Sequence, residues 1–428
     1  MWAHRSFFAA VEQALFATSN FVVNVLLARR LPAREYGAFV AAYAVFQLLG
    51  QVHVGMLAEP MQVFGSGKHA GRFAHYLRAL LRGHCLVGGG ISLVLAAVGV
   101  VLSVTGADVM GGAFLVLAAA APFITLSWLM RTACTVIMRP DLAAVSGGLN
   151  FFLVLTGLQA LHAHGRLSVG AALATLGLSS VFASAVLVAW FRVLTVRSAE
   201  RVNSAEVLRD HWRYGRWSTG AGLLNWMPTD FFLLVLSFWG GLQDTAALKA
   251  LTNLLQPALQ TQYVLTNLLT PVFVRLRGRP QFTRTLLGAS GAALIAFGGY
   301  WVLVGWFHAP LMRWVYAGRF AEQSALLWGL GALPMLAGLG AVLTSALRAL
   351  ERPDRVFVSA VIASGVAVAC VPFVGLWGLT GVAAARVVSS LAFIATLWLF
   401  FARLPRNGRG GSPAGEAADA VATEGVPG

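Results

Sequence analysis

The stretch "RPDLAAVSG" (residues 139–147) returns as "RPDRVFVSA" (residues 352–360), 213 positions later, which is half the length of the 428-residue chain. Two further pairs of short words recur at an offset of 210: "TSNF" with "PTDF" from Thr18, and "LSSVF" with "VSSLA" from Leu178. A near-constant offset predicts that the second half of the chain duplicates the first. We therefore expect two similar lobes in one chain.

Each "RPD" stretch is predicted to mark a helix boundary. Its proline cannot continue a helix, and Asp141 and Asp354 can cap the helix that follows. Arg139 and Arg352 add positive charge to the cytoplasmic side. This structural interpretation requires no chemistry; the alternative is a paired functional gate at the inner mouth.

The composition is typical of a membrane protein. Hydrophobic residues make up 58% of the chain and charged residues only 11%, whereas soluble domains carry about 25% charged residues. Since about 20 apolar residues cross the hydrocarbon layer as a helix, the apolar runs predict an all-α polytopic protein with twelve spans. The predicted spans cover residues 8–27, 37–57, 83–104, 113–130, 142–161, 169–191, 217–238, 247–273, 285–306, 323–346, 356–375 and 378–402.

The loops predict the orientation of the chain. With a cytoplasmic N-terminus, the inner segments carry 23 basic residues and the outer loops 7, so both termini are expected inside. The net charge of +15 is therefore interpreted as a topology signal, and no nucleic-acid partner is predicted. The expected domains are an N-terminal six-helix lobe (1–191), a cytoplasmic inter-lobe linker (192–216), a C-terminal six-helix lobe (217–402) and a disordered cytoplasmic tail (403–428).

Motifs for cofactors and metals are weak. The three cysteines are too scattered for a disulfide framework or a zinc site, and "GSGK" at residues 65–68 lacks the remaining residues of a phosphate loop. The "HAH" at residues 162–164 is expected to be a solvated loop. We predict no cofactor and no metal site.

Polar side chains follow single faces of several spans. In the eighth span Lys249, Asn253, Gln256 and Gln260 share one helical stripe. The first two spans repeat the pattern, the seventh carries Asp230 about midway, and Arg386 lies inside the twelfth. Because polar groups in lipid are costly, these stripes predict a central polar cleft between the lobes; the alternative is that the amides bond neighbouring helices. The further cleft candidates are Asn20, Asn24, Gln47, Gln51 and Asp230.

Several stretches of the sequence resemble those of a known family. The stretch "LLARRLPAREYGAFVAAYAVF" joins the first two spans with Arg30, Leu31 and Tyr36-Gly37, the seventh span carries Asp230, and "RP" follows the fourth and tenth spans. Over residues 8–402 this pattern is similar to the Wzx-type polysaccharide flippases of the multidrug/oligosaccharidyl-lipid/polysaccharide (MOP) exporter superfamily. The resemblance implies a MATE-like fold with two parallel six-helix lobes.

The resemblance also implies a function. Such proteins carry a polyprenyl-pyrophosphate-linked oligosaccharide to the outer leaflet of the bacterial cytoplasmic (inner) membrane by alternating access, and they are not enzymes. Lys249 and Arg386 are then the candidates for the pyrophosphate and the amide stripes for sugar hydroxyls, with Asp230 as a site for a coupling proton or sodium ion. Membrane lipids and polysaccharide assembly proteins are the other expected partners. The alternatives are a drug or metabolite cation antiporter of the same fold, and a membrane polysaccharide polymerase or ligase.

Overall fold

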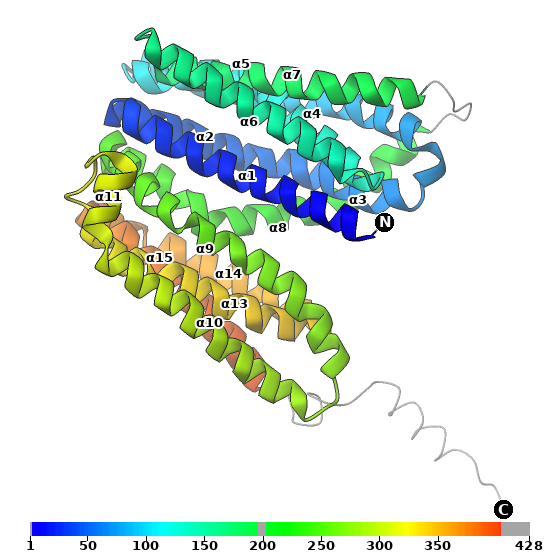
Figure 1. Cartoon of the computed structure of the whole chain (residues 1–428), viewed down its shortest axis with the longest axis vertical. Helices are drawn as coiled ribbons and strands as arrows, with labels where there is room; N and C mark the ends of the chain where they lie inside the picture. Colours follow the sequence, from blue (N-terminus) through cyan, green and yellow to red (C-terminus); the bar gives the residue numbers. More distant parts are fainter. Residues whose placement is uncertain (1, 196–202, 404–428) are drawn as a thin grey trace, which may run out of the picture. The chain divides into compact units, whose positions relative to one another are not determined.

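The computed structural model describes residues 2–195 and 203–403, and every regular element in these ranges is a helix (Figure 1). The predicted disordered tail, from residue 404 onward, and residues 196–202 of the predicted linker lie outside the described residues. The elements are α1 (Trp2–Arg30), α2 (Ala33–His53), the π-helix η1 (Val54–Ala58), α3 (Glu59–Ser66), the 3-10 turn η2 (Ala70–Arg72), α4 (Phe73–Val104), α5 (Asp108–Val136), α6 (Pro140–Ala163), α7 (Val169–Thr195), α8 (Ser204–Trp239), α9 (Gly241–Leu276), α10 (Gln281–Trp306), α11 (His308–Tyr316), the 3-10 turn η3 (Ser324–Leu326), α12 (Leu327–Leu330), α13 (Ala332–Ala349), α14 (Pro353–Ala369) and α15 (Val371–Ala402).

Ten helical segments of the described chain are long and apolar enough to cross a membrane. This confirms the prediction of an all-α polytopic membrane protein. The predicted spans over α9 and α14 are not among the ten: the stretch of α9 between Lys249 and Arg275 has no charge but carries several amides, among them Gln256 and Gln260, and α14 has only 17 residues. The count of twelve and the cytoplasmic placement of the termini stay predictions.

The chain forms two compact units. The first comprises Met1–Asn253 and Val315–Arg319, and the second comprises Leu254–Trp314 and Phe320–Gly428. Helix α8 belongs to the first unit because it packs along α2 and η1. The units therefore differ from the lobes expected from the repeat, and the lobe boundaries stay a prediction.

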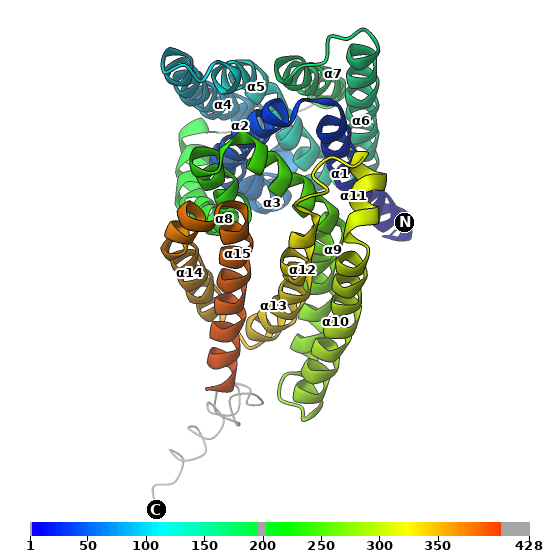
Figure 2. The same ribbon diagram turned by 90° about the vertical axis from the view of Figure 1, so that its left-hand side faces the viewer.

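Helix α5 is the centre of the first unit. It packs against α4 and α7 over most of its length and also contacts α2 and α6, while α1 lies along α6 (Figures 1 and 2). Where α3, α4, α5 and α7 meet, their apolar side chains form a core that includes the fully buried Met61, Leu129 and Met130. The first unit is thus a helix bundle with its own hydrophobic core.

The second unit is built from α10, α13, α14 and α15 with the second part of α9. Helix α13 packs against α10 and α15, and Phe273, Phe282 and Phe401 are buried in the shared core. Gly378 breaks α15 near its start, with φ 53° and ψ −127°, a conformation that is unfavourable for any residue with a side chain. This break falls in the "GLWG" stretch that separates the predicted eleventh and twelfth spans.

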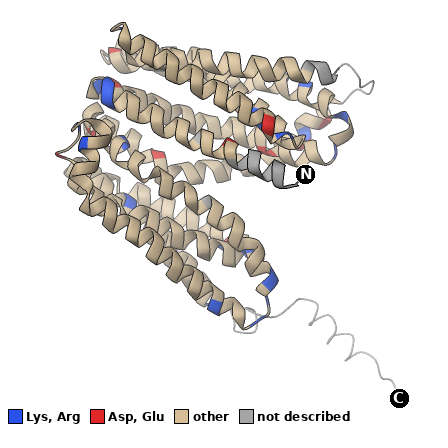
Figure 3. Ribbon diagram, in the orientation of Figure 1, with Lys and Arg blue, Asp and Glu red and all other residues tan. Residues whose placement is uncertain are grey.

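Charged residues lie mainly near helix ends and connecting turns, and long stretches of the helices carry none (Figure 3). A charge in the middle of an apolar helix is costly, so each exception needs a partner or a function. Asn203 shows how one helix end is satisfied: its side-chain oxygen accepts the backbone N–H of Ala205 at 3.0 Å and caps α8.

The two "RPD" stretches form the same turn. Arg139 has φ −118° and ψ 61°, and Arg352 has φ −117° and ψ 53°. The residue before each arginine is left-handed, with φ 58° at Met138 and 59° at Glu351. The predicted helix boundaries are confirmed, and the shared backbone is what a duplicated turn would show.

The predicted capping role of the two aspartates is wrong. Helices α6 and α14 begin at the prolines, so each aspartate is the second helical residue and neither makes a side-chain cap. Asp141 instead accepts hydrogen bonds from Nε and Nη2 of Arg139 at 2.9 and 2.8 Å. The carboxylate of Asp141 therefore pairs with the arginine of its own turn.

We predict that Met138→Gly stabilises the protein. A residue with a side chain in the left-handed region destabilises the folded state by roughly 1 kcal/mol, and glycine relieves this strain. Part of the gain is offset because glycine gives the unfolded chain more conformational freedom. The apparent melting temperature in detergent should rise by a few degrees. Val145→Gly, at an exposed position inside α6, should lower it. A fall with Met138→Gly would contradict the left-handed turn.

Candidate functional site

A polar cavity of about 80 Å³ lies inside the first unit, among α1, α2, α5, α6 and α7. Two residues predicted from the sequence, Asn20 and Asn24, line it, together with Tyr43, Arg131 and Asn150. Since a water molecule occupies about 30 Å³ in the liquid, the cavity holds a few waters or an ion and is too small for a sugar. Hydroxyl groups complete its polar lining at Ser19, Ser127 and Ser180.

One wall of the cavity is aromatic. Tyr36, Phe39, Tyr43 and Phe46 follow one face of α2, with successive ring centroids 6.3, 5.6 and 5.4 Å apart. The Tyr36 hydroxyl donates to Oδ1 of Asn24 at 3.2 Å. The Asn24 amide also donates to the Asn20 carbonyl at 2.8 Å, so Asn24 links α1 to α2, as the alternative interpretation of the amides requires.

Arg131, which also lines the cavity, forms an ion pair. Nη2 of Arg131, in α5, binds Oε1 of Glu12, in α1, and their side chains are only 15% and 22% exposed. Sequence reasoning missed this pair because 119 positions separate its members. On α6, the buried Oδ1 of Asn150 accepts no hydrogen bond from the described residues. The cavity is therefore lined by an arginine whose charge Glu12 balances and by a vacant acceptor.

The predicted coupling residue, Asp230, is half-buried in α8. Its carboxylate accepts from the Thr229 hydroxyl at 3.2 Å and acts electrostatically on the Tyr43 hydroxyl. Lys249, half-buried in α9, makes no ion pair with any described residue. Both residues belong to the first unit.

The predicted glutamines of α2 are half-buried. Gln51 donates to the Gln47 carbonyl at 3.4 Å. A Cβ at Gly222 of α8 would lie 2.7 Å from Oε1 of Gln51, so this side chain lies against α8. Gln51 therefore fills the contact between α2 and α8.

Asn253 is buried and its amide is occupied. It donates to the Tyr316 hydroxyl at 3.3 Å and to the Phe21 carbonyl at 3.4 Å. Tyr316 donates in turn to the Ala250 carbonyl at 2.9 Å. The segment Val315–Arg319 is thus tied to the first part of α9, and Asn253 holds this segment in place.

Arg319 anchors the same segment at the end of α1. Its Nη1 donates to the carbonyl oxygens of Ala28 at 3.0 Å and Leu31 at 2.5 Å. These groups lie at the C-terminal end of a helix, where partial negative charge favours a cation. Val315–Arg319 therefore packs into the first unit although the chain on both sides of it belongs to the second.

The other predicted cleft residues belong to the second unit. Gln256 and Gln260 are half-buried in α9, and Arg386 is buried in α15 at 8% exposure. Helix α9 passes from the first unit to the second between Asn253 and Leu254, and Pro257 cannot donate to the Asn253 carbonyl. The shared central cleft stays a prediction, because its members are divided between the two units.

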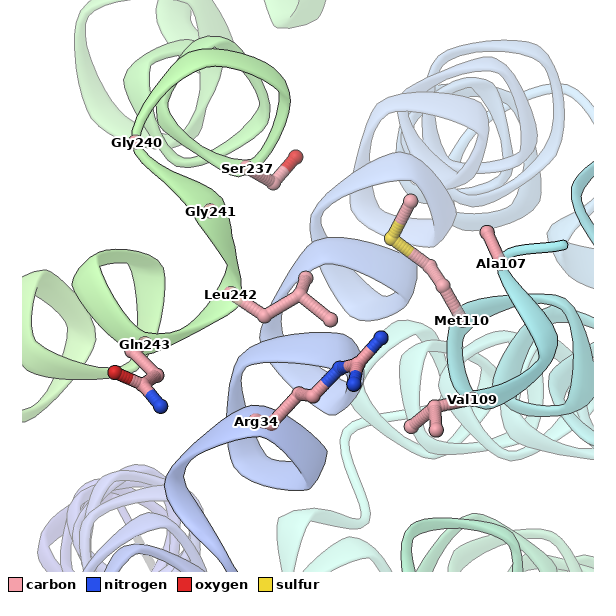
Figure 4. A pocket seen from close by; sticks show the side chains of 9 residues that line it. All are labelled: Arg34, Ala107, Val109, Met110, Ser237, Gly240, Gly241, Leu242 and Gln243. Atoms are coloured by element: carbon pink, nitrogen blue, oxygen red, sulfur yellow. The ribbon is translucent and has the colours of Figure 1, made fainter.

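A second, more open pocket of about 440 Å³ lies where three helix ends of the first unit meet (Figure 4). Arg34 extends from the first turn of α2 into the space between the α8–α9 turn and the start of α5. Gln243 and Ser237 add polar groups. Sequence reasoning missed this pocket because its residues come from three separate connections; the "RRLPAR" run and the glycine pair at 240–241 are its only signals.

The fold is that of the MOP superfamily transporters. An inward-facing multidrug resistance MATE family transporter superimposes with a TM-score of 0.74 at 15% identity, over 92% of this chain and 98% of that one. Lipid II flippase MurJ, in an inward closed conformation, gives 0.71 at 12% identity, over 94% and 89%. A MOP superfamily transporter from Pyrococcus furiosus gives 0.65 at 16% identity, over 93% and 94%. No family model and no curated protein sequence matches the chain.

We predict that the Glu12–Arg131 pair is worth more than a surface pair. Removing either partner leaves a poorly hydrated charge, so Glu12→Gln and Arg131→Gln should each cost roughly 1–3 kcal/mol. The double variant should cost less than the sum, as measured by thermal unfolding in detergent. Arg139→Gln, in an exposed pair, is the control with little expected effect. Strict additivity of the two costs would show that the side chains do not interact.

Proposed function

We propose that this protein is a transporter that moves a polyprenyl-pyrophosphate-linked oligosaccharide from the inner to the outer leaflet of the bacterial cytoplasmic membrane by alternating access. The cargo crosses without covalent change, so the protein acts as a flippase and not as an enzyme. Polysaccharide assembly proteins would supply and receive the cargo. Lys249 and Arg386 bind its pyrophosphate, and amides such as Gln47, Gln256 and Gln260 bind its sugars.

The charge balance of the spans carries this proposal. The twelve predicted spans contain four charged residues: Glu12, Asp230, Lys249 and Arg386. The Glu12 carboxylate is bound by Arg131, and the other three residues sum to one positive charge. Lys249 is half-buried, lies nine residues into α9 and has no ionic partner among the described residues, and an unpaired, partly buried cation favours an anionic ligand. An anionic cargo supplies that partner.

A pyrophosphate suits these residues chemically. Arginine and lysine both bind phosphate oxygens through charge-assisted hydrogen bonds, and the lipid tail can stay in the hydrocarbon layer. Two of the similar structures bear on the cargo: one is a lipid II flippase, and the other has a binding pocket of reversed polarity that suggests a different function. Pocket polarity is thus a feature by which transporters of this fold differ, and the unpaired charge of Lys249 favours an anion over a cationic drug.

We predict that cells lacking the protein accumulate lipid-linked oligosaccharide on the inner leaflet. The measurement is the fraction of the glycan that a membrane-impermeant glycosidase or lectin reaches in intact spheroplasts. That fraction should fall severalfold and return on expression of the intact chain. Unchanged export of every surface glycan would contradict the proposal, and the loss of efflux of a cationic dye would favour the antiporter instead.

We predict that Lys249→Ala and Arg386→Ala each lower the rate of glycan transport about ten- to hundredfold, as expected for one charge-assisted hydrogen bond of roughly 1.5–3 kcal/mol. Asp230→Asn should impair coupled transport as well. The matched controls are the exposed Arg284→Ala in α10 and Asp108→Asn in α5, which should transport normally. Membrane insertion is checked by the amount of folded protein. Normal transport by Lys249→Ala and Arg386→Ala together would remove both from the cargo site.

A further inference from the structure

Two histidines of the first unit form a buried pair that the proposed cargo site does not use. Nε2 of His53, at the end of α2, lies 3.0 Å from Nδ1 of His84, in α4, and the two rings meet edge to face. The two residues are 0% and 6% exposed. The remaining ring nitrogen of His53, Nδ1, is buried and has no hydrogen-bond partner among the described residues.

The surroundings of His84 fix where the protons of the neutral pair lie. The carbonyl of Pro122, in α5, acts on the His84 ring as a hydrogen-bond acceptor. Since Nδ1 of His84 faces His53, the donating atom is Nε2. A neutral imidazole has one N–H, so Nδ1 of His84 must be the acceptor, and His53 must donate from Nε2. The bare nitrogen of the pair is therefore Nδ1 of His53.

This nitrogen is the site where a proton can add without breaking an existing bond. Protonation at Nδ1 makes His53 an imidazolium that still donates from Nε2 to His84. A second proton would place N–H against N–H at 3.0 Å, so the pair binds one proton. Besides its partner imidazole, no titratable side chain of the described chain acts electrostatically on either ring, and the burial of both rings favours the neutral pair in the present arrangement.

The pair adjoins an irregular segment that contacts α8. The π-helix η1 begins at Val54, the residue after His53, and Glu59 N–H closes it on the Val54 carbonyl. Nδ1 of His211, in α8, donates to the Met56 carbonyl in η1 at 2.7 Å. A Cβ at Gly55 would lie 2.5 Å from Oγ1 of Thr219, so the two backbones are in close contact. Short π-helices often mark functional sites.

We propose that Nδ1 of His53 is a proton-binding site, and that its occupancy is coupled to the contact between η1 and α8. A protonated Nδ1 needs an acceptor that the present arrangement does not supply. Proton binding therefore favours a state in which η1 shifts and a backbone carbonyl or water reaches this nitrogen. The role of this step in driving transport rests on the proposed function; proton binding itself does not.

The proton site is tested directly by ¹⁵N NMR of histidine-labelled, full-length protein in lipid nanodiscs between about pH 8 and pH 5, the range in which histidine changes its charge. The bare-nitrogen signal of His53, assigned by its loss in His53→Gln, should disappear as the pH falls, while the Nε2–H signal persists. His162→Gln, at an exposed position in the last turn of α6, is the control and should leave the pair unchanged. A His53 signal that does not titrate in this range overturns the proposal.

The coupling is tested by alkylation at the contact with α8. Thr219→Cys is introduced into a variant whose three native cysteines are replaced, and its modification rate is compared with and without His53→Gln. The ratio of the rate with native His53 to the rate with His53→Gln cancels the intrinsic pH dependence of the thiol. It should rise about fivefold or more as the pH falls through the histidine range, and should stay flat when His162→Gln is the compared variant. A flat ratio with His53→Gln overturns the coupling.

The two proposals fail separately. If glycan transport is absent but His53 titrates and the alkylation rate of Thr219→Cys follows, the cargo assignment is wrong and the proton site stands. If glycan transport is normal but its dependence on an imposed proton gradient is the same in the intact chain and in His53→Gln, the driving role of the pair is wrong. Where His53→Gln folds poorly, His84→Asn, which keeps an acceptor oxygen for His53, replaces it.

Discussion

In hydrocarbon surroundings, a polar group with no partner inside the protein costs several kcal/mol, and this requirement shapes the whole chain. The backbone meets it by forming helices throughout the described ranges. Many hydroxyls meet it within their own helix: Thr125, Thr175 and Ser345 donate to the carbonyl four residues earlier. Two of the exceptions are informative, since Asn150 Oδ1 and His53 Nδ1 are buried without partners among the described residues and lie at a polar cavity and beside a π-helix.

Sequence periodicity was sufficient for the helices and for the repeated turn, because both depend on local chemistry. The prolines at 140 and 353 fix where α6 and α14 begin, and the matched backbone angles of Arg139 and Arg352 follow from the same three letters. The pairing of Glu12 with Arg131, and of His53 with His84, depends on which helices become neighbours. Composition and spacing carry little information on that, so the sequence stripes identified polar faces but not their partners.

For the same reason, the sequence only partly predicts which polar residues are available to bind a ligand and which hold helices together. Asn24 and Asn253 look like cleft residues in the sequence, yet their amides hold α1, α2 and the segment Val315–Arg319 in place. Lys249 differs because the described residues offer it no ionic partner. A fold shared with transporters of several cargoes does not select among them, so the proposal depends on this charge and not on the fold.

The chemistry of an anionic cargo also bears on how a proton could be used. A carboxylate such as Asp230 becomes negative when it releases its proton, and in a low-dielectric interior that charge repels a pyrophosphate over several ångströms. An imidazole pair alternates between neutral and positive and is never negative. For an anionic cargo, a proton bound and released at His53 would never leave a negative charge in the protein, whereas a proton bound and released at Asp230 would, so the two sites make different demands on the cargo.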